Sequence, residues 1–422
     1  MRLRINNISK IKATENIEFD GITVIAGANN TGKSTISKVL YCIFTTLYRI
    51  DKQIIDLRKN DTLDYINNIL GFDIFSDEDI DNIYQSIIVD KDIVKCRNIL
   101  NSLSNNNDNI SELIEEFIKK IETNILNIKD DEYKNRIATK HFNNEFIGQC
   151  SSILNDENGT ANLIIKNTDL NFALNNDNEL IINDKQFKIL HKVFYYDGPN
   201  LIDNNANRSV FPFVRMLRHN NHQSDFYNSI KLDKDMSNER ISNKKKANEI
   251  FNKYFNTEKD FPELEIKFRN KINKFDGVTI KGAKEQLRVE RLSSGLKTIS
   301  ALYNLFCNAI IDEDILILDE PEINLHPEWQ VYLAELLIEL RNKFNLTLLI
   351  STHSPYFINA INTYSFKYKI QNLCHYYMAK NIIENDVEYS VLNEILNIDD
   401  IYDSLAIPFE RLLKDREALF NE

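Results

Sequence analysis

Apolar residues follow two different spacings in the first fifty residues. Short apolar runs at 17–19 and 22–25, separated by Asp20 and Gly21, are typical of strands joined by a tight turn. From Ser34 onward apolar residues recur every three or four positions, the period of a helix that buries one face: Ile36, Val39, Leu40, Ile43, Phe44 and Leu47. The pattern therefore predicts a strand that leads through a turn at Gly27 into a helix.

The middle of the chain changes character twice. Residues 51–150 predict a helical insertion, with one clear amphipathic helix at 110–121 and no heptad pattern long enough for a coiled coil. Residues 151–285 predict a β-rich segment with a charged helical excursion at 231–254, and its strand-like stretches are 163–167, 170–174, 179–183 and 192–197.

The last third alternates helix and strand patterns. A helical apolar face at 296–306 precedes a buried strand at 315–318, and a helix that opens at Pro327 precedes another strand at 346–351. This alternation predicts an α/β fold with a largely parallel sheet covered by helices. Residues 366–422 are expected to form a C-terminal tail, whose last helix is either a docking region or a solvated helix.

Composition narrows the class of protein. The chain has 422 residues, 43% of them hydrophobic, so a globular fold is expected, and its net charge of −12 disfavours nucleic acid unless basic residues gather on one face. The five cysteines lie far apart, which indicates a reducing compartment without a disulfide framework. No signal peptide and no apolar run of about 20 residues is present, so a cytoplasmic protein without membrane segments is expected.

A glycine-rich segment carries the strongest chemical signal. Residues 27–34, GANNTGKS, match the P-loop pattern in the strand-then-helix context that this motif requires. Lys33 would neutralise the β and γ phosphates of ATP, and Ser34 would bind Mg²⁺. The predicted nucleotide-binding residues are Gly27, Asn29, Asn30, Thr31, Gly32, Lys33, Ser34 and Thr35.

An acidic pair completes this site. The apolar strand 315–318 runs directly into Asp319 and Glu320, and burial of the strand places both carboxylates at the edge where α/β proteins bind ligands. Asp319 would hold the Mg²⁺ shell, and Glu320 would polarise the attacking water. Taken alone, the pair could also be a solvated acidic turn.

Two further segments resemble ABC-class ATPases. Leu292-Ser293-Ser294-Gly295 resembles their signature motif, and the segment 351–354, STHS, resembles their switch-histidine segment, which makes His353 a second catalytic candidate. In that family the signature of one copy binds the nucleotide of another. Ser293, Ser294 and Gly295 therefore imply a head-to-tail dimer that sandwiches ATP, with higher oligomers left open. The implied fold is an ABC ATPase head with a P-loop mixed sheet, a helical insertion and an antiparallel β segment, its core formed by 1–50 and 286–365.

Three assignments depend on this resemblance. Gln149 is the candidate for the glutamine that contacts the metal, although a plain surface glutamine is an equal alternative. The segment 319–330, DEPEINLHPEWQ, resembles the region after the acidic pair in OLD-like and RecF/Rad50-like ATPases of the AAA_15/AAA_21 type. It nominates Asn324 and His326 for the interface between copies, and His326 could equally cap a helix.

The resemblance also suggests a biological role. OLD nucleases continue into a TOPRIM domain, for which the residues after His353 are too few, so the chain is expected not to cut nucleic acid itself. ATPases of this type resemble the ATPase subunits of antiphage modules such as Septu and PARIS, in which a separate effector, a nuclease or toxin, is the partner. The alternative is a RecF/Rad50-like DNA-repair clamp, which needs a basic groove. The modest basic clusters at 215–219 and 244–246 fit charged helical surfaces better. A transporter ATPase is a third, less favoured reading.

Overall fold

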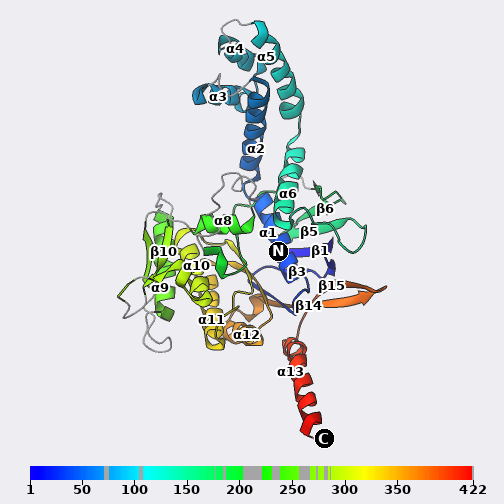
Figure 1. Ribbon diagram of the computed structural model, residues 1–422, viewed down its shortest axis with the longest axis vertical. Coiled ribbons are helices and arrows are strands. Elements are labelled where there is room, and N and C mark those ends of the chain that lie inside the picture. Colours follow the sequence, from blue (N-terminus) through cyan, green and yellow to red (C-terminus); the bar gives the residue numbers. More distant parts are fainter. Residues whose placement is uncertain are drawn as a thin grey trace.

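The computed structural model describes residues 1–70, 76–103, 108–175, 177–183, 187–202, 221–230, 238–255, 267–271, 274–279, 284–285 and 287–420. The basic cluster expected at 215–219 lies outside these residues. A central body carries a helical arm on one side, and a single C-terminal helix leaves it on the opposite side (Figure 1).

One mixed sheet organises the body. Within the described residues its strand order is β7-β6-β5-β1-β2-β15-β14-β4-β13-β12-β8, and β3 pairs with β1. The strands are β1 (Arg2–Ile8), β2 (Ile11–Thr14), β3 (Ile17–Glu18), β4 (Ile22–Gly27), β5 (Gly159–Ile165), β6 (Thr168–Leu174), β7 (Leu180–Asn183), β8 (Val193–Tyr196), β12 (Ile315–Asp319), β13 (Thr347–Thr352), β14 (Cys374–Glu384) and β15 (Val387–Glu394). A smaller sheet contains β9 (Lys267–Lys271), β10 (Lys274–Thr279) and β11 (Leu287–Arg288).

The sheet has a parallel half and an antiparallel half. Strands β8, β12, β13, β4 and β14 run parallel to one another, and β4, β8 and β12 are buried along their whole length. Strands β1, β5, β6 and β7 pair antiparallel. The predicted α/β class with a mixed sheet is confirmed. Because parallel strands end at the same edge, the ends of β4, β12, β13 and β8 meet there.

Helices cover both faces of the sheet, form the arm and, at the C-terminus, leave the body (Figure 1). They are α1 (Lys33–Leu47), α2 (Ile50–Tyr65), α3 (Asp77–Tyr84), α4 (Ile93–Leu103), α5 (Asp108–Ile121), α6 (Asp130–Phe146), α8 (His222–Ser229), α9 (Asn238–Phe255), α10 (Ser294–Asn308), α11 (Pro327–Phe344), α12 (Pro355–Lys367) and α13 (Asp399–Phe420). Apolar residues of α1 and α6 share one core cluster with one face of the sheet, and those of α10, α11 and α12 share another with the opposite face.

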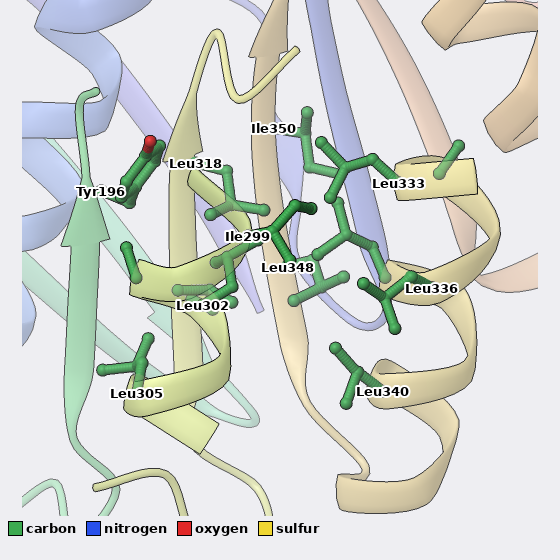
Figure 2. Close-up of a cluster of buried hydrophobic side chains, with 14 of the residues drawn as sticks. Tyr196, Ile299, Leu302, Leu305, Leu318, Leu333, Leu336, Leu340, Leu348 and Ile350 are labelled. Atoms are coloured by element: carbon green, nitrogen blue, oxygen red, sulfur yellow. The ribbon is translucent and has the colours of Figure 1, made fainter. Parts of the chain in front are cut away.

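Figure 2 shows part of the second cluster. Leu318 of β12 and Leu348 and Ile350 of β13 project toward leucine and isoleucine side chains on α10 and α11. The helical partners labelled there are Ile299, Leu302, Leu305, Leu333, Leu336 and Leu340. Burial of these side chains on one face, together with the cluster on the opposite face, fixes the strand ends that carry the chemistry.

Helices α2 to α6 form the arm, which projects from the body (Figure 1). Its helices are interrupted by π-helical turns at Ile66–Leu70, Gln85–Val89 and Glu122–Leu126. The helix predicted at 110–121 is α5. The arm has its own apolar cluster, in which Phe117 and Ile121 are fully buried. It is therefore a packed helical unit rather than a continuous coiled coil.

The C-terminal segment differs from the expected tail. Residues 374–394 contribute β14 and β15 to the centre of the main sheet, and β14 pairs directly with β4. The side chain of Tyr377 is buried, and its hydroxyl accepts a hydrogen bond from the N–H of Glu18 (2.8 Å) and donates one to the carbonyl of Asn16 (3.1 Å). Only α13, which follows, leaves the body.

Candidate nucleotide site

The phosphate cradle is built where β4 turns into α1. A Cβ atom on Gly27 would lie 2.5 Å from the carbonyl oxygen of Ala379, so only glycine fits beside β14. Gly32, the residue before α1, has a φ of 84°, a left-handed conformation that glycine adopts without strain. The buried amino group of Lys33 donates to the carbonyls of Gly27 (2.9 Å) and Ala28 (2.8 Å). The loop therefore wraps around a lysine at the start of a helix, which suits phosphate.

The acidic pair faces this cradle from the end of β12. Asp319 is held by the hydroxyl groups of Tyr195 (3.2 Å) and Ser351. Glu320 has a left-handed backbone, with a φ of 47°, which is uncommon for a residue with a side chain. Its carboxylate lies 3.5 Å from Nζ of Lys33 and 3.2 Å from Nδ1 of His353. The structure thus brings together three residues that stand far apart in the sequence.

A cleft of about 460 Å³ lies beside the phosphate cradle and the acidic pair, and His353 is not among the residues that line it. It is lined by residues 29–35, Asp319 and Glu320, and also by Ser9, Lys10, Ile153, Asp197 and Ile323. The hydroxyl of Ser34 and the carboxylate of Asp319 are hard oxygen donors of the kind that Mg²⁺ prefers. Among the described residues no three or more His, Cys, Asp or Glu are grouped to hold a metal. A hydroxyl and a carboxylate suit a Mg²⁺ ion that takes its other ligands from phosphate and water.

A second, larger hollow lies elsewhere. It measures about 850 Å³ and is lined by residues at the amino ends of β8 and β12, among them Lys192, Val193 and Asp314. The phosphate cradle and the acidic pair lie at the carboxyl ends of the strands, which is where open α/β sheets bind ligands. The smaller cleft is therefore the candidate nucleotide site.

Asp197, at the end of β8, was not singled out in the sequence. It lines the cleft, its carboxylate lies 2.8 Å from Nε2 of His222, and it accepts a hydrogen bond from the side chain of Gln223 (2.8 Å). The sequence pattern that identified Asp319, an apolar strand that ends in an acid, also occurs at 192–197. Gln149, the proposed metal contact, lies exposed after the end of α6 and is not among the residues that line the cleft.

His222 connects this acid with the base of the arm. Its Nδ1 lies 2.6 Å from a carboxylate oxygen of Glu145, which is on the last turn of α6, and its ring stacks on Tyr195 with centroids 4.1 Å apart. Burial by itself lowers the pKa of this imidazole, but the hydrogen bonds and charges of Asp197 and Glu145 outweigh burial and raise the pKa to about 9. The ring is therefore a cation between two carboxylates at neutral pH.

The signature residues lie outside this cleft. Ser293 caps α10, and its hydroxyl accepts a hydrogen bond from the N–H of Leu296 (3.4 Å). Ser294 and Gly295 form the first turn of α10, and neither lines the cleft. A Cβ atom on Gly295 would lie 2.7 Å from Cδ2 of Leu325, so the signature turn packs tightly on the segment that follows the acidic pair.

The two interface candidates occupy that same segment. Asn324 has a left-handed φ of 63°, and its carbonyl oxygen is 3.9 Å from the position of a Cβ on Gly295. His326 caps α11, and its Nδ1 accepts a hydrogen bond from the N–H of Glu328 (3.4 Å). The capping alternative is thus observed for His326. Signature, Asn324 and His326 form one continuous region beside, but not in, the cleft.

Comparison with known proteins identifies the family. A family model described as "AAA ATPase domain" matches residues 1–358. The phosphate import ATP-binding protein PstB 1 of Ligilactobacillus salivarius is 38% identical over 72 residues, which are 17% of this chain and 26% of that protein, so the chain matches only about a quarter of the curated relative's length.

Solved structures show distant likeness. The SMC head domain from Thermotoga maritima is 12% identical, with 93% of this chain and 98% of that chain covered, at a TM-score of 0.36. An ATP-binding cassette of an ABC transporter in its ADP conformation is 14% identical, with coverage of 97% and 96%, at a TM-score of 0.35. Likeness at this level says nothing of function.

Among the described helices, none has an apolar stretch long enough to cross a bilayer.

Proposed function

Because the chain belongs to the AAA ATPase domain family, we propose that it binds ATP and hydrolyses it to ADP and phosphate. One observation carries the proposal. Lys33 of the phosphate cradle, Glu320 of the acidic pair and His353 converge on one point, with Glu320 within 3.5 Å of both partners. This arrangement supports a site in which the γ-phosphate of ATP is bound beside a cation, a base and an imidazole.

Each of these residues has its own role in the proposed hydrolysis of ATP. Lys33 and the backbone amides of residues 29–34 bind the phosphates, and Glu320 orients the attacking water and accepts its proton. His353 donates a hydrogen bond to the γ-phosphate. Ser34 and Asp319 would hold Mg²⁺, which when bound neutralises charge on the phosphate oxygens. The left-handed backbone of Glu320 aims its carboxylate back toward Lys33 rather than away from the sheet edge.

The proposed active form is a head-to-tail pair of copies of the ABC type. The region of Ser293, Ser294 and Gly295 lies outside the cleft of its own chain, and it begins a helix of 15 residues, α10. In a head-to-tail pair this helix start would face the γ-phosphate bound by the partner, where its free N–H groups would stabilise negative charge. Asn324 and His326 would contact the partner beside it.

We further propose that the nucleotide state controls a separate effector protein, a nuclease or toxin, in cytoplasmic antiphage defence. The resemblance of the segment 319–330 to OLD-like ATPases supports this role. Two surfaces outside the ATPase core are available for a partner. One is the arm, and the other is α13, on which Ile407 and Leu412 are more than half exposed.

The test uses the full chain expressed together with its genomic neighbours. Wild type, Lys33→Ala and Glu320→Gln would be purified by a tag on this chain, and ATP hydrolysis and copurifying protein and DNA measured. We expect hydrolysis by wild type only, and a protein partner whose binding Lys33→Ala abolishes. Hydrolysis without any partner would overturn the effector role. DNA retained by Glu320→Gln alone would favour the repair clamp.

A further inference from the structure

Three consecutive residues, Ser351 and Thr352 at the end of β13 and His353 directly after it, each contact one of three acids at or after the end of β12. The hydroxyl of Ser351 donates to Asp319, the hydroxyl of Thr352 donates to Glu322, and the ring of His353 lies 3.2 Å from Glu320. The first and third contacts belong to the site described above. The second, between Thr352 and Glu322, has no role there.

Glu322 is buried to a degree that is unusual for a carboxylate. Its residue is 2% exposed, and its Oε2 atom is buried without a hydrogen-bond partner in the structure. Burial of a carboxyl group with one oxygen unpaired is costly, so an apolar residue of similar size would be the more stable choice if packing were the only requirement. Such a group calls for an explanation beyond packing.

The hydrogen bonds continue from Thr352 to the interface candidates. The N–H of Ser354 donates to Oγ1 of Thr352 (3.0 Å), and the hydroxyl of Ser354 donates to Oε1 of Gln330 (2.5 Å). The amide of Gln330 in turn donates to the carbonyl of Leu325 (3.1 Å). His353 is therefore flanked on both sides by residues tied to the segment 322–330.

We propose that Glu322 is a positioning residue: through Thr352 it fixes His353 against Glu320 and couples this pair to the segment that contains Asn324 and His326. The inference rests on the proposed ATP hydrolysis. It assigns to Glu322 no contact with nucleotide, because Glu322 is only 2% exposed and does not line the cleft. Its effect is on the placement of the two residues that do the chemistry, and so it acts on the rate of hydrolysis rather than on ATP binding.

The segment 323–326 links Glu322 to the signature turn. Leu325 packs against the signature turn at Gly295, and its N–H donates to the carbonyl of Glu322 (3.0 Å). A displacement of the signature region would therefore move the backbone of Glu322, and with it Thr352. Two sites that share one buried network of this kind respond as a unit.

The experiment compares Glu322→Gln and Thr352→Val with a matched control, Glu335→Gln. Glu335 is a buried carboxylate on α11 that accepts hydrogen bonds from Lys367 and Tyr368, away from the cleft. In purified full-length protein we expect each test variant to lower kcat for ATP roughly tenfold to hundredfold, as for misplaced catalytic groups. We expect KM for ATP to stay within about twofold, since uniform binding is untouched. The control is expected to match wild type in both.

A double variant separates positioning from a structural role. If Glu322 acts through His353, Glu322→Gln adds no further loss of kcat in a His353→Ala background, because the interaction is already gone. Equal losses in both backgrounds, or a normal kcat for Glu322→Gln, would overturn the inference. Thr352→Val repeats the test from the other partner if Glu322→Gln is unstable in thermal unfolding. A wild-type chain that hydrolyses no ATP would instead overturn the proposed function, and the inference with it.

Discussion

His222 is a buried imidazole that lies between two carboxylates. It is 4% exposed, and both of its ring nitrogens face an acid, Glu145 at 2.6 Å and Asp197 at 2.8 Å. The pKa of Asp197 is lowered, because its hydrogen bonds and attraction to His222 outweigh the effect of burial. The imidazole therefore compensates two charges, one in the cleft and one at the base of the arm.

This arrangement predicts a pH dependence of stability. The pKa of His222 is about 9 in the folded chain and about 6.5 when unfolded. A raised pKa contributes stability that is fully present below pH 6.5 and is lost as pH rises through 9. We expect the free energy of unfolding to fall by an amount on the order of 3 kcal/mol over this interval.

Denaturant unfolding of wild type and His222→Gln from pH 6 to 9.5 checks this expectation. The variant cannot carry the charge, so the difference between the two chains should shrink as pH rises. The comparison also cancels other groups that titrate in this range. A difference that stays constant with pH would mean that the ring is not a cation in the folded chain.

Among the secondary-structure elements, the helical arm stands apart because it has its own apolar cluster. Phe117 on α5 is fully buried among isoleucines of the arm, whereas Leu113, one turn earlier, is 38% exposed. The arm meets the body at two helices. Helix α2 follows α1 in the chain, and α6 packs against α1 and β7. Loss of packing in the arm should therefore lower the stability of the arm and leave that of the central sheet unchanged.

Phe117→Ala tests this separation. The cavity should cost about 3–5 kcal/mol of local stability, while Leu113→Ala should cost far less because little area is lost. Hydrogen exchange should then show faster exchange in α3 to α5 and unchanged protection in β4, β12 and β13. Equal deprotection of the central strands would indicate that arm and body unfold as one unit.

How much the sequence predicted also varies from element to element. The strand and helix around Gly27 and the strand ending at Asp319 were predicted correctly, because each has a clear apolar period next to a motif. The strand β14 was not, because its pattern, CHYYMAKNIIE, mixes polar and apolar residues, and only pairing with β4 decides its place. Contacts between distant segments, such as His222 with Glu145 and Asp197, leave no local pattern at all.

At the scale of the whole molecule, the proposed pair of copies predicts that two inactive variants recover ATP hydrolysis when they are mixed. If each cleft is completed by the signature of the other chain, Lys33→Ala and Ser294→Arg are each inactive but damage different halves of the site. Mixed pairs then contain one intact site. With random exchange of chains, an equal mixture should recover about a quarter of wild-type activity.

Measurement of ATP hydrolysis after mixing decides between the two arrangements. The control is a mixture of Lys33→Ala with Glu320→Gln, which damage the same half of the site, so that no mixed pair is intact. Recovery in the first mixture alone supports a shared site. Absence of recovery in both, with exchange of chains verified, would place the complete site within one chain.

The position of β4 between β13 and β14 has a consequence for how the protein is made. The strand that carries the phosphate cradle pairs Ile22 with Leu348 on one side and with Cys374 on the other. During translation at roughly 5–20 residues per second, both edges of this strand remain unpaired for on the order of tens of seconds, until β13 and β14 have been synthesised. A chain released from the ribosome before β14 is made would thus lack an ordered cradle, and the capacity to bind ATP would mark synthesis past this strand.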